Sequence, residues 1–270
     1  MALSILVSAL WVCLASAAPS ASAPPAASPA PPPRAKEFRI DRWDWTASGE
    51  LSSAVRRVVV RNDYGDIRAR FAGDGIVNLH AVIQRLGSDP DVGVNVERHG
   101  DALAITVVSP PGRVSVDQAD LPKTAVDRVD LVVYVPAHAA LDAESLRGMV
   151  EARGLKNDVR AVTREGEIRV NTSAAVEARS QGGAVTVAMG REGSGPRRVE
   201  SQSGPVWVSL PADADLRLLV DAGGDLTSEI DLQPSEPTPG RRRGTAVLGK
   251  GSQPVVITSG TGRVEIVRTR

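Results

Sequence analysis

A short phrase recurs through the C-terminal half of the chain and restricts what it can fold into. The phrase is a glycine followed by apolar side chains two and four residues later, and it begins at Gly148, Gly166, Gly183, Gly204, Gly224 and Gly262. Successive copies lie 18, 17, 21, 20 and 38 residues apart, so the last interval corresponds to about two periods. A fixed period of about 20 residues is typical of stacked repeats.

Apolar and polar residues alternate after each glycine, which is the periodicity of a strand with one buried face. In one copy Ile168 and Val170 would point inward, while Glu167 and Arg169 would point into water. β-branched side chains suit such a packed, pleated surface. Each period is therefore predicted to be strand, turn, strand. The glycine lies in the turn, where it permits either a positive φ angle or a close approach of two backbones.

One such unit cannot bury its apolar face alone, whereas stacked units share a continuous core. The repeats therefore predict an all-β solenoid, a single-stranded β-helix-like coil that we expect to be right-handed, with rungs of about 20 residues. The aromatic content of only 3% favours this narrow coil, because small branched aliphatics can line it. The alternative is a β-sandwich of meandering hairpins, since regularly spaced short strands also suit that fold.

The first residues are typical of an export signal rather than of a folded domain. Residues 1–17 form an apolar run that ends in small residues, which predicts cleavage between Ala17 and Ala18, although no Lys or Arg precedes the run. The run is shorter than the roughly 20 residues of a membrane span, so we expect no span in the mature chain. It contains Cys13, the only cysteine. Residues 18–36 are rich in Pro and Ala and predict a disordered tether.

The remaining chain divides into an N-terminal β region, residues 37–147, and the repeat solenoid of residues 148–270, which we expect to be continuous with it. Gly65 begins the same phrase in the N-terminal region. A loop is predicted over Ser109–Lys123, and Arg268 and Arg270 are expected to discourage edge pairing on the last strand. Further strands are predicted over Val77–Ile83, Val92–Val96, Leu103–Val108 and Val129–Val135.

No catalytic motif is found in the sequence. The 32 Lys and Arg balance the 32 Asp and Glu, which argues against a nucleic-acid partner. The three histidines have no metal-ligand spacing, and no nucleophile or phosphate-binding motif occurs. We therefore predict a protein that is not an enzyme and holds no cofactor or metal.

Two features are candidate ligand contacts. Trp207 alternates with inward-facing Val206 and Val208, so its ring should face outward. The segment Gln233–Gly244 is rich in Pro and Gly and is predicted to project as a surface loop. It carries Arg241, Arg242 and Arg243, which could contact an anionic polymer or simply be solvated.

Other side chains have a structural and a functional interpretation. Trp43 and Trp45 are expected to cap the N-terminal end of the stack. Outward rows of Arg and Glu form solvent-facing charge ladders or, alternatively, a groove like that of polysaccharide lyases. Carboxylates at turns cap the backbone or, if aligned in neighbouring rungs, bind calcium; they are Asp63, Asp66, Asp221 and Asp225.

Four motifs in a fixed order give the chain a resemblance to a known family. They lie at Asn62–Ile67, Val129–Pro136, Thr163–Ile168 and, at the end, Gly249–Gly251 with Ile257–Val264. Over about residues 55–270 the sequence resembles the bacterial putative-adhesin family of β-strand-repeat domains. The resemblance implies a β-helix-like fold, an envelope location and a role in adhesion or envelope stress, and it supplies no catalytic residues. Ser228 departs from the pattern, because an aliphatic side chain is expected there.

The sequence as a whole predicts an exported, non-enzymatic β-solenoid of the periplasm, cell surface or extracellular space. Its expected partner is an envelope or extracellular polymer or a surface protein. The alternatives are a polysaccharide-degrading β-helix enzyme and an envelope-stress accessory protein that acts on protein partners.

Overall fold

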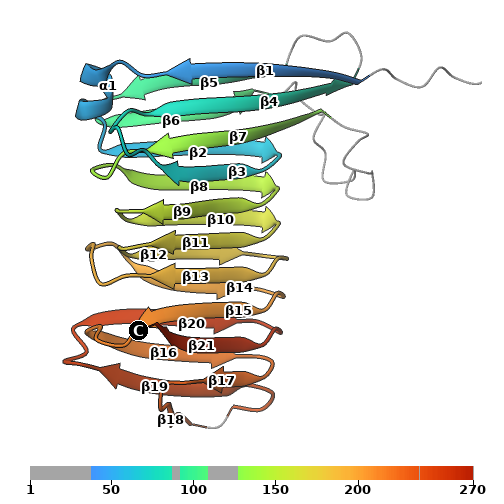
Figure 1. Ribbon diagram of the computed structural model, residues 1–270. Helices are drawn as coiled ribbons and strands as arrows, with labels where there is room; N and C mark the ends of the chain where they lie inside the picture. Colours follow the sequence, from blue (N-terminus) through green and yellow to red (C-terminus); the bar gives the residue numbers. More distant parts are fainter. Residues whose placement is uncertain (1–37, 87–91, 109–126, 237, 270) are drawn as a thin grey trace, which may run out of the picture. The chain divides into compact units, whose positions relative to one another are not determined.

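The computed structural model describes residues 38–86, 92–108, 127–236 and 238–269. These described residues form one compact unit, built almost entirely from two large β-sheets (Figure 1). The predicted export signal, the tether and the loop at Ser109–Lys123 lie outside the described residues.

Sheet A contains ten strands and sheet B eleven. In spatial order sheet A consists of β1 (Phe38–Thr46), β4 (Asn78–Leu86), β7 (Arg128–Val135), β3 (Ile67–Phe71), β9 (Val150–Leu155), β11 (Ile168–Thr172), β13 (Val185–Met189), β15 (Val206–Pro211), β21 (Val264–Thr269) and β17 (Leu226–Ser228). Sheet B consists of β18 (Gln233–Pro234), β19 (Arg242–Leu248), β16 (Leu216–Ala222), β20 (Gln253–Ser259), β14 (Arg197–Ser201), β12 (Val176–Ser180), β10 (Val159–Glu165), β8 (Ala140–Arg147), β2 (Arg57–Tyr64), β6 (Ala102–Val108) and β5 (Gly93–His99).

The middle of the stack has the parallel pairing that a solenoid requires. Each rung there places one strand in each sheet, as β10 and β11 do on either side of Gly166. The pairs between neighbouring rungs are parallel, whereas meandering hairpins would give antiparallel pairs. The all-β prediction and the stacked, mostly parallel arrangement are therefore confirmed.

The inward positions stack in register into aliphatic columns. Ile168 lies opposite Val185 on one side and Val150 on the other, and all three are fully buried. Branched side chains of similar size fill such a narrow space without aromatic rings. Trp43 and Trp45 pack against the core from β1, as predicted for the N-terminal end. The helix α1 (Gly49–Ala54) follows β1 and begins after Ser48, whose side chain accepts a hydrogen bond from the Leu51 amide.

The repeated glycines stack directly on one another at one corner of the coil. A Cβ placed on Gly183 would lie 1.7 Å from the carbonyl oxygen of Gly166, and one on Gly166 would lie 2.0 Å from that of Gly148. Among the seven repeat glycines only Gly65 and Gly148 have a positive φ angle. Close approach of successive backbones, rather than backbone conformation, is therefore the common requirement for glycine.

The spatial order of the rungs differs from their order in the sequence. The last two strands of the chain, β20 and β21, lie between the β14–β15 rung and the β16–β17 rung. Likewise, β2 and β3 lie inside the stack, with β6 and β7 beyond them. The prediction that Arg268 protects a terminal edge was therefore wrong, because β21 has a neighbour on each side.

The segment Gln233–Gly244 does not simply project as a loop. β18 pairs with β19, and β19 pairs with β16 in antiparallel fashion, so the segment folds back onto sheet B. Ser228, which departs from the repeat pattern, lies in an irregular strand. β17 is only three residues long, and the Ser228 hydroxyl is hydrogen-bonded to the backbone of Ile230.

Candidate binding groove on sheet A

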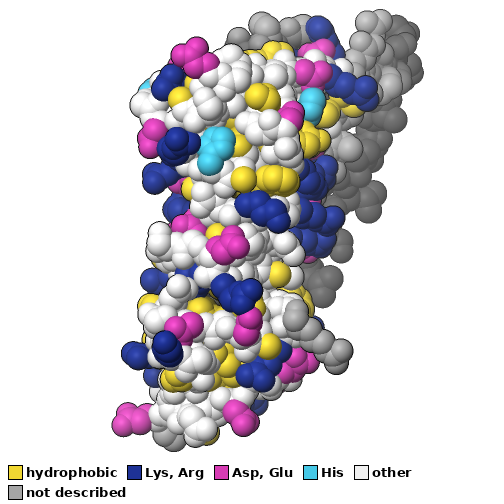
Figure 2. All heavy atoms as spheres, turned by 60° about the vertical axis from the view of Figure 1, so that its left-hand side comes forward, with side chains coloured by type: hydrophobic (Ala, Val, Ile, Leu, Met, Phe, Trp, Pro, Cys, Tyr) yellow, Lys and Arg dark blue, Asp and Glu magenta, His cyan; other side chains and the backbone are white. Residues whose placement is uncertain are grey.

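The outer face of sheet B carries a continuous ladder of ion pairs. Arg61 donates two hydrogen bonds of 3.1 Å to the carboxylate of Asp142, and Arg160 approaches the same carboxylate at 2.8 Å. The ladder continues across the next strands through Glu144, Glu177, Arg179, Glu200 and Arg198. Figure 2, which turns the left-hand side of Figure 1 forward, shows acidic and basic side chains intermixed there as well.

This ladder neutralises its own charges. Burial alone would raise the pKa of Asp142, but the hydrogen bonds and charges of Arg61 and Arg160 hold it below its ordinary value. A general acid needs the opposite shift, because it must keep its proton near neutral pH. The ladder is therefore compensated in charge within the protein, as expected for solvent-facing charge ladders.

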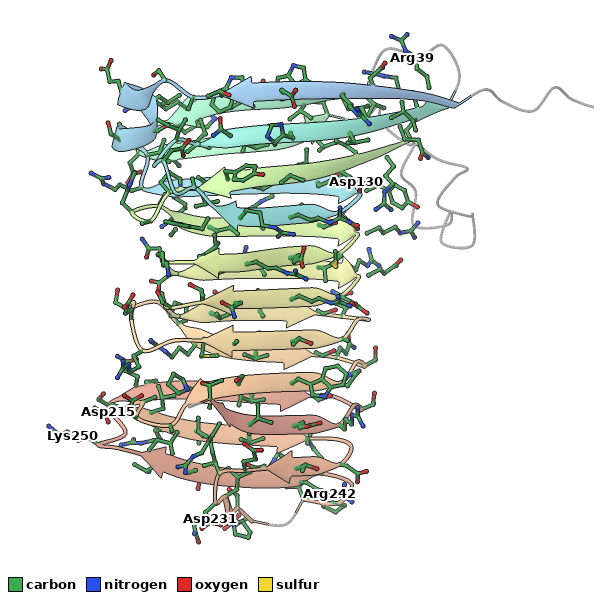
Figure 3. The ribbon with its side chains drawn as sticks, in the orientation of Figure 1. Arg39, Asp130, Asp215, Asp231, Arg242 and Lys250 are labelled. Atoms are coloured by element: carbon green, nitrogen blue, oxygen red, sulfur yellow. The ribbon has the colours of Figure 1, made fainter. Side chains whose placement is uncertain are left out.

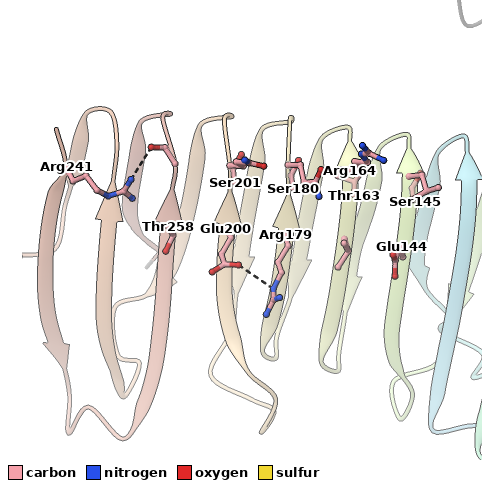
Figure 4. A pocket seen from close by; sticks show the side chains of 15 residues that line it. Glu144, Ser145, Thr163, Arg164, Arg179, Ser180, Glu200, Ser201, Arg241 and Thr258 are labelled. Carbon is pink, nitrogen blue, oxygen red and sulfur yellow. Dashed lines mark hydrogen bonds and ion pairs between the residues drawn. The ribbon is translucent and has the colours of Figure 1, made fainter. Parts of the chain in front are cut away.

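A groove of about 590 Å³ runs along the corner of sheet B (Figure 4). Its charged wall contains Arg179 and Glu200, whose guanidinium and carboxylate atoms lie 3.5 Å apart. Its hydroxyls are also engaged, since Oγ of Ser180 and of Ser201 donate to the carbonyls of Gly166 and Gly183. The polar groups of this groove are largely committed to the protein itself.

A second groove, of about 520 Å³, lies on the outer face of sheet A. Thr186 and Ala188 project from β13, between Arg169 on β11 and Trp207 on β15. Because the two β13 side chains are short and their neighbours are long, the surface sinks over β13. Asn171 and Ser209 extend the small, polar floor on either side of Ala188.

Trp207 forms one wall of the sheet A groove. Its ring is half-buried, and its Nε1 donates a hydrogen bond of 3.1 Å to Oε2 of Glu265 on β21. The guanidinium carbon of Arg263 lies 5.2 Å from the ring centroid, a cation–π contact. These two contacts fix the orientation of the indole, and the prediction that it faces outward is confirmed.

Arginines border the opposite side of the sheet A groove. Arg153 and Arg169 are about half exposed and pair with Glu151 and Glu167, the second pair at 2.5 Å. Glu151 is almost fully buried and also accepts a hydrogen bond of 2.6 Å from Arg70. Burial would raise the pKa of Glu151, but the hydrogen bond from Arg70 and the charges of Arg153 and Arg68 hold it low.

The three arginines of the basic segment lie far along the stack, beside the β16–β17 turn. Arg241 and Arg243 both bind the carboxylate of Asp221, at 2.5 and 3.0 Å. Arg242, labelled in Figure 3, pairs with Asp225 and donates a hydrogen bond of 3.0 Å to the carbonyl of Gly224. An anionic ligand at this place would compete with two carboxylates of the chain itself.

The turn carboxylates do not form the neighbouring rows that calcium binding would need. Asp66 belongs to the β2–β3 corner, where it pairs with Arg68 and Arg128, whereas Asp221 and Asp225 lie several rungs away. Within the described ranges no group of three or more His, Cys, Asp or Glu side chains could hold a metal ion. No helix in the part of the chain that the structure describes is long and apolar enough to cross a membrane.

Sequence reasoning missed a buried row of hydroxyls beside the glycines. Three residues before a repeat glycine, a Ser or Thr side chain donates to the carbonyl of the glycine in the adjacent rung at 2.9–3.1 Å. The members of this row are Ser145, Thr163, Ser180, Ser201 and Ser259. The signal was present in the sequence as a Ser or Thr at a fixed offset, and Asp221 replaces it before Gly224.

No family description matches the sequence, and no curated protein matches it. A putative cell adhesion protein from Clostridium sporogenes aligns over 86% of this chain and 100% of that chain, with 10% identity and a TM-score of 0.47. Putative adhesins from Bacteroides fragilis and Parabacteroides distasonis each align over 85% of this chain and 97% of theirs, with 11% and 12% identity and TM-scores of 0.35.

The chain thus has structural matches to several bacterial putative adhesins at low sequence identity, in keeping with the resemblance of its motifs. Because all of these TM-scores lie below 0.5, the matches carry no conclusion about a ligand or an activity.

Proposed function

We propose that this protein is an exported, non-enzymatic β-solenoid that binds a glycan polymer of the cell envelope or extracellular space through the groove on sheet A. The observation that carries the proposal is the combination of an oriented, half-buried Trp207 with a floor of short side chains. Binding sites of this kind join apolar and aromatic surface to a few placed polar groups. An indole wall beside small polar residues suits a sugar ring, which has an apolar face and hydroxyl edges.

The direction of the groove also suits a polymer. Its lining residues come from neighbouring strands β9, β11, β13, β15 and β21, so the groove crosses the strands and follows the axis of the stack. A chain lying in it could extend over several rungs without meeting a projecting turn. The half-exposed Arg153 and Arg169 offer hydrogen-bond donors to acidic or neutral sugars.

The test is a sedimentation assay of residues 18–270 with peptidoglycan, a surface polysaccharide and lipid vesicles, each at low and high salt. We expect saturable binding to a polysaccharide fraction that persists at high salt, because stacking is not screened by ions. Trp207→Ala should weaken binding about tenfold, which corresponds to one lost aromatic contact. Ala188→Arg, which fills the floor and leaves the indole in place, should weaken it as well.

Two control variants separate the groove from other surfaces. Leu219→Ala alters an exposed apolar side chain on the outer face of sheet B and should bind like the unchanged protein. Replacing Arg241, Arg242 and Arg243 together with Gln tests the basic segment. If binding were salt-sensitive and only this triple variant lost it, the basic segment would be the contact site. If no fraction showed saturable binding, the proposal would be wrong.

A further inference from the structure

At the N-terminal end of the stack sheet A is one strand longer than sheet B. The strands β2 and β3 form one rung, and from them sheet B continues through β6 to β5, while sheet A continues through β7 and β4 to β1 (Figure 1). The strand β1 therefore overhangs, with no counterpart in sheet B among the described residues.

The inward side of the overhanging strand carries Trp43 and Trp45 in its C-terminal half and Arg39 and Asp41 in its N-terminal half. Its apolar part is incompletely covered. Trp43 and Trp45 are only half-buried, and so are Val94 and Val96 on β5, the last strand of sheet B. Farther inside the stack an inward side chain such as Leu131 is 1% exposed. Two tryptophans over an unfinished layer leave apolar surface that a further layer would bury.

The free edge of β1 is also suited to pairing. It pairs with β4 over nine residues in unbroken register, and it contains no proline or glycine. The opposite end of the stack is blunted, since β17 has three residues and β18 has two, one of them Pro234. Short strands and proline prevent edge pairing, and β1 has neither. Charged side chains on an edge also oppose pairing, so a partner strand must match the charges of β1.

We propose that the N-terminal end is a dimer interface, in which β1 pairs in antiparallel fashion with β1 of a second copy. A two-fold axis perpendicular to sheet A would keep the tryptophans of both copies on the inner side. Inward residues of one β1 must then lie opposite inward residues of the other, since a register shift by one residue would pair an inward residue with an outward one.

Charge complementarity selects one register. The outward residues of β1 include Arg42 and Asp44. Centring the axis on Arg42 or on Asp44 would place two like charges in contact, whereas centring it on Trp43 places each Arg42 opposite Asp44 of the second copy. This register gives two reciprocal Arg–Asp pairs on the outer face. On the inner face it places Trp43 opposite Trp43 and Trp45 opposite Asp41 of the second copy, so four tryptophans enter the space between the two β5 edges. Each Asp41 carboxylate remains paired with Arg39 and Arg85 of its own copy.

The proposal is tested by exchanging the charges of this pair. Sedimentation velocity of residues 18–270 should show a concentration-dependent monomer–dimer equilibrium. Arg42→Asp alone would place two carboxylates opposite each other, and Asp44→Arg alone would place two guanidinium groups opposite each other. Each variant should raise the dissociation constant of the dimer about tenfold or more. An equimolar mixture of the two variants should restore dimers, because the two carboxylates of one variant then face the two guanidinium groups of the other.

Thermal melting of each variant shows whether the fold is kept. Arg217→Asp on β16, an exposed residue near the opposite end of the stack, is the matched control and should leave the dimer intact. A protein that stays monomeric over the accessible concentration range would overturn the proposal. Variants that dissociate but do not recover in the mixture would overturn the register. Neither result bears on the groove at Trp207, because that site lies several rungs away on the same sheet.

Discussion

At the corners of the stack a single methyl group decides whether two rungs can pack. The Cβ of an alanine at position 183 would lie 1.7 Å from a backbone oxygen, so the backbone of one rung must move. At the neighbouring Gly182 the nearest atom would be 3.6 Å away, which is ordinary contact. Neither glycine has a positive φ angle, so the two substitutions differ in steric contact and not in backbone strain.

Gly183→Ala is therefore expected to lower the free energy of unfolding by about 1–3 kcal/mol, the usual cost of overpacking. Gly182→Ala is its matched control and should be neutral or slightly stabilising, because alanine lowers the conformational entropy of the unfolded chain. Urea denaturation of the two variants measures the difference. Equal denaturation midpoints would show that the stacked repeat glycines are not in close backbone contact.

The hydroxyl row gives a second prediction at this scale. Oγ of Ser201 donates a hydrogen bond to the carbonyl of Gly183 and accepts one of 2.8 Å from the amide of Gly204. Ser201 is buried, so removing its hydroxyl would leave these two backbone groups without this partner. Ser201→Ala should cost about 1–3 kcal/mol, because it leaves buried polar groups unpaired. Ser203→Ala removes an exposed hydroxyl with one bond of 3.1 Å and should change stability by no more than about 0.5 kcal/mol. Similar losses for both would contradict the structural role of the row.

At the scale of the strand, the charged side chains on the outer faces form rows of ion pairs rather than patches of one sign. Neighbouring strands offer opposite charges at matched positions, as Arg169 and Glu151 do across β11 and β9. Most of these pairs are exposed and contribute little individually. Glu151 differs from the exposed pairs, because its carboxylate is buried among three arginines.

Glu151→Gln should lower the free energy of unfolding at neutral pH by about 1.5–3 kcal/mol, the value of a hydrogen bond to a charged group. The folded-state pKa lies below the ordinary value of 4.5, so the stabilisation is fully present above that pH and is lost as pH falls through the folded pKa. The gap between the two proteins should therefore narrow in acid. Glu167→Gln, on an exposed pair, should lower the free energy of unfolding by about 0.5 kcal/mol or less. A gap for Glu151→Gln that stays constant down to acidic pH would contradict this assignment.

The strands and their inward faces could be read from the sequence, because alternation is a local property. Trp207 was predicted to face outward on that basis. The groove beside it was not predictable, since it depends on which side chains of β13 lie next to Trp207. That alignment is set by the register between rungs, which no local pattern specifies.

At the scale of the molecule, the spatial order of the rungs could not be predicted from the sequence. Every rung presents similar aliphatic columns, so the phrase at Gly262 fits beside any other copy. The 38-residue interval from Gly224 to Gly262 also holds β18 and β19, and β19 pairs with the edge of β16 that faces away from β20. The chain then passes back to place β20 and β21 on the inner side. The end of the chain is consequently not the end of the stack.

Hydrogen exchange measured strand by strand tests this order. A solenoid opens from its ends, since a terminal rung has one neighbour and an inner rung has two. The amides of β20 and β21 should therefore be among the best protected in the C-terminal third, although they are last in the sequence. The amides of β17, β18 and β19 should exchange first. If protection instead fell steadily toward residue 269, β20 and β21 would lie at the edge, and the inserted order would be wrong.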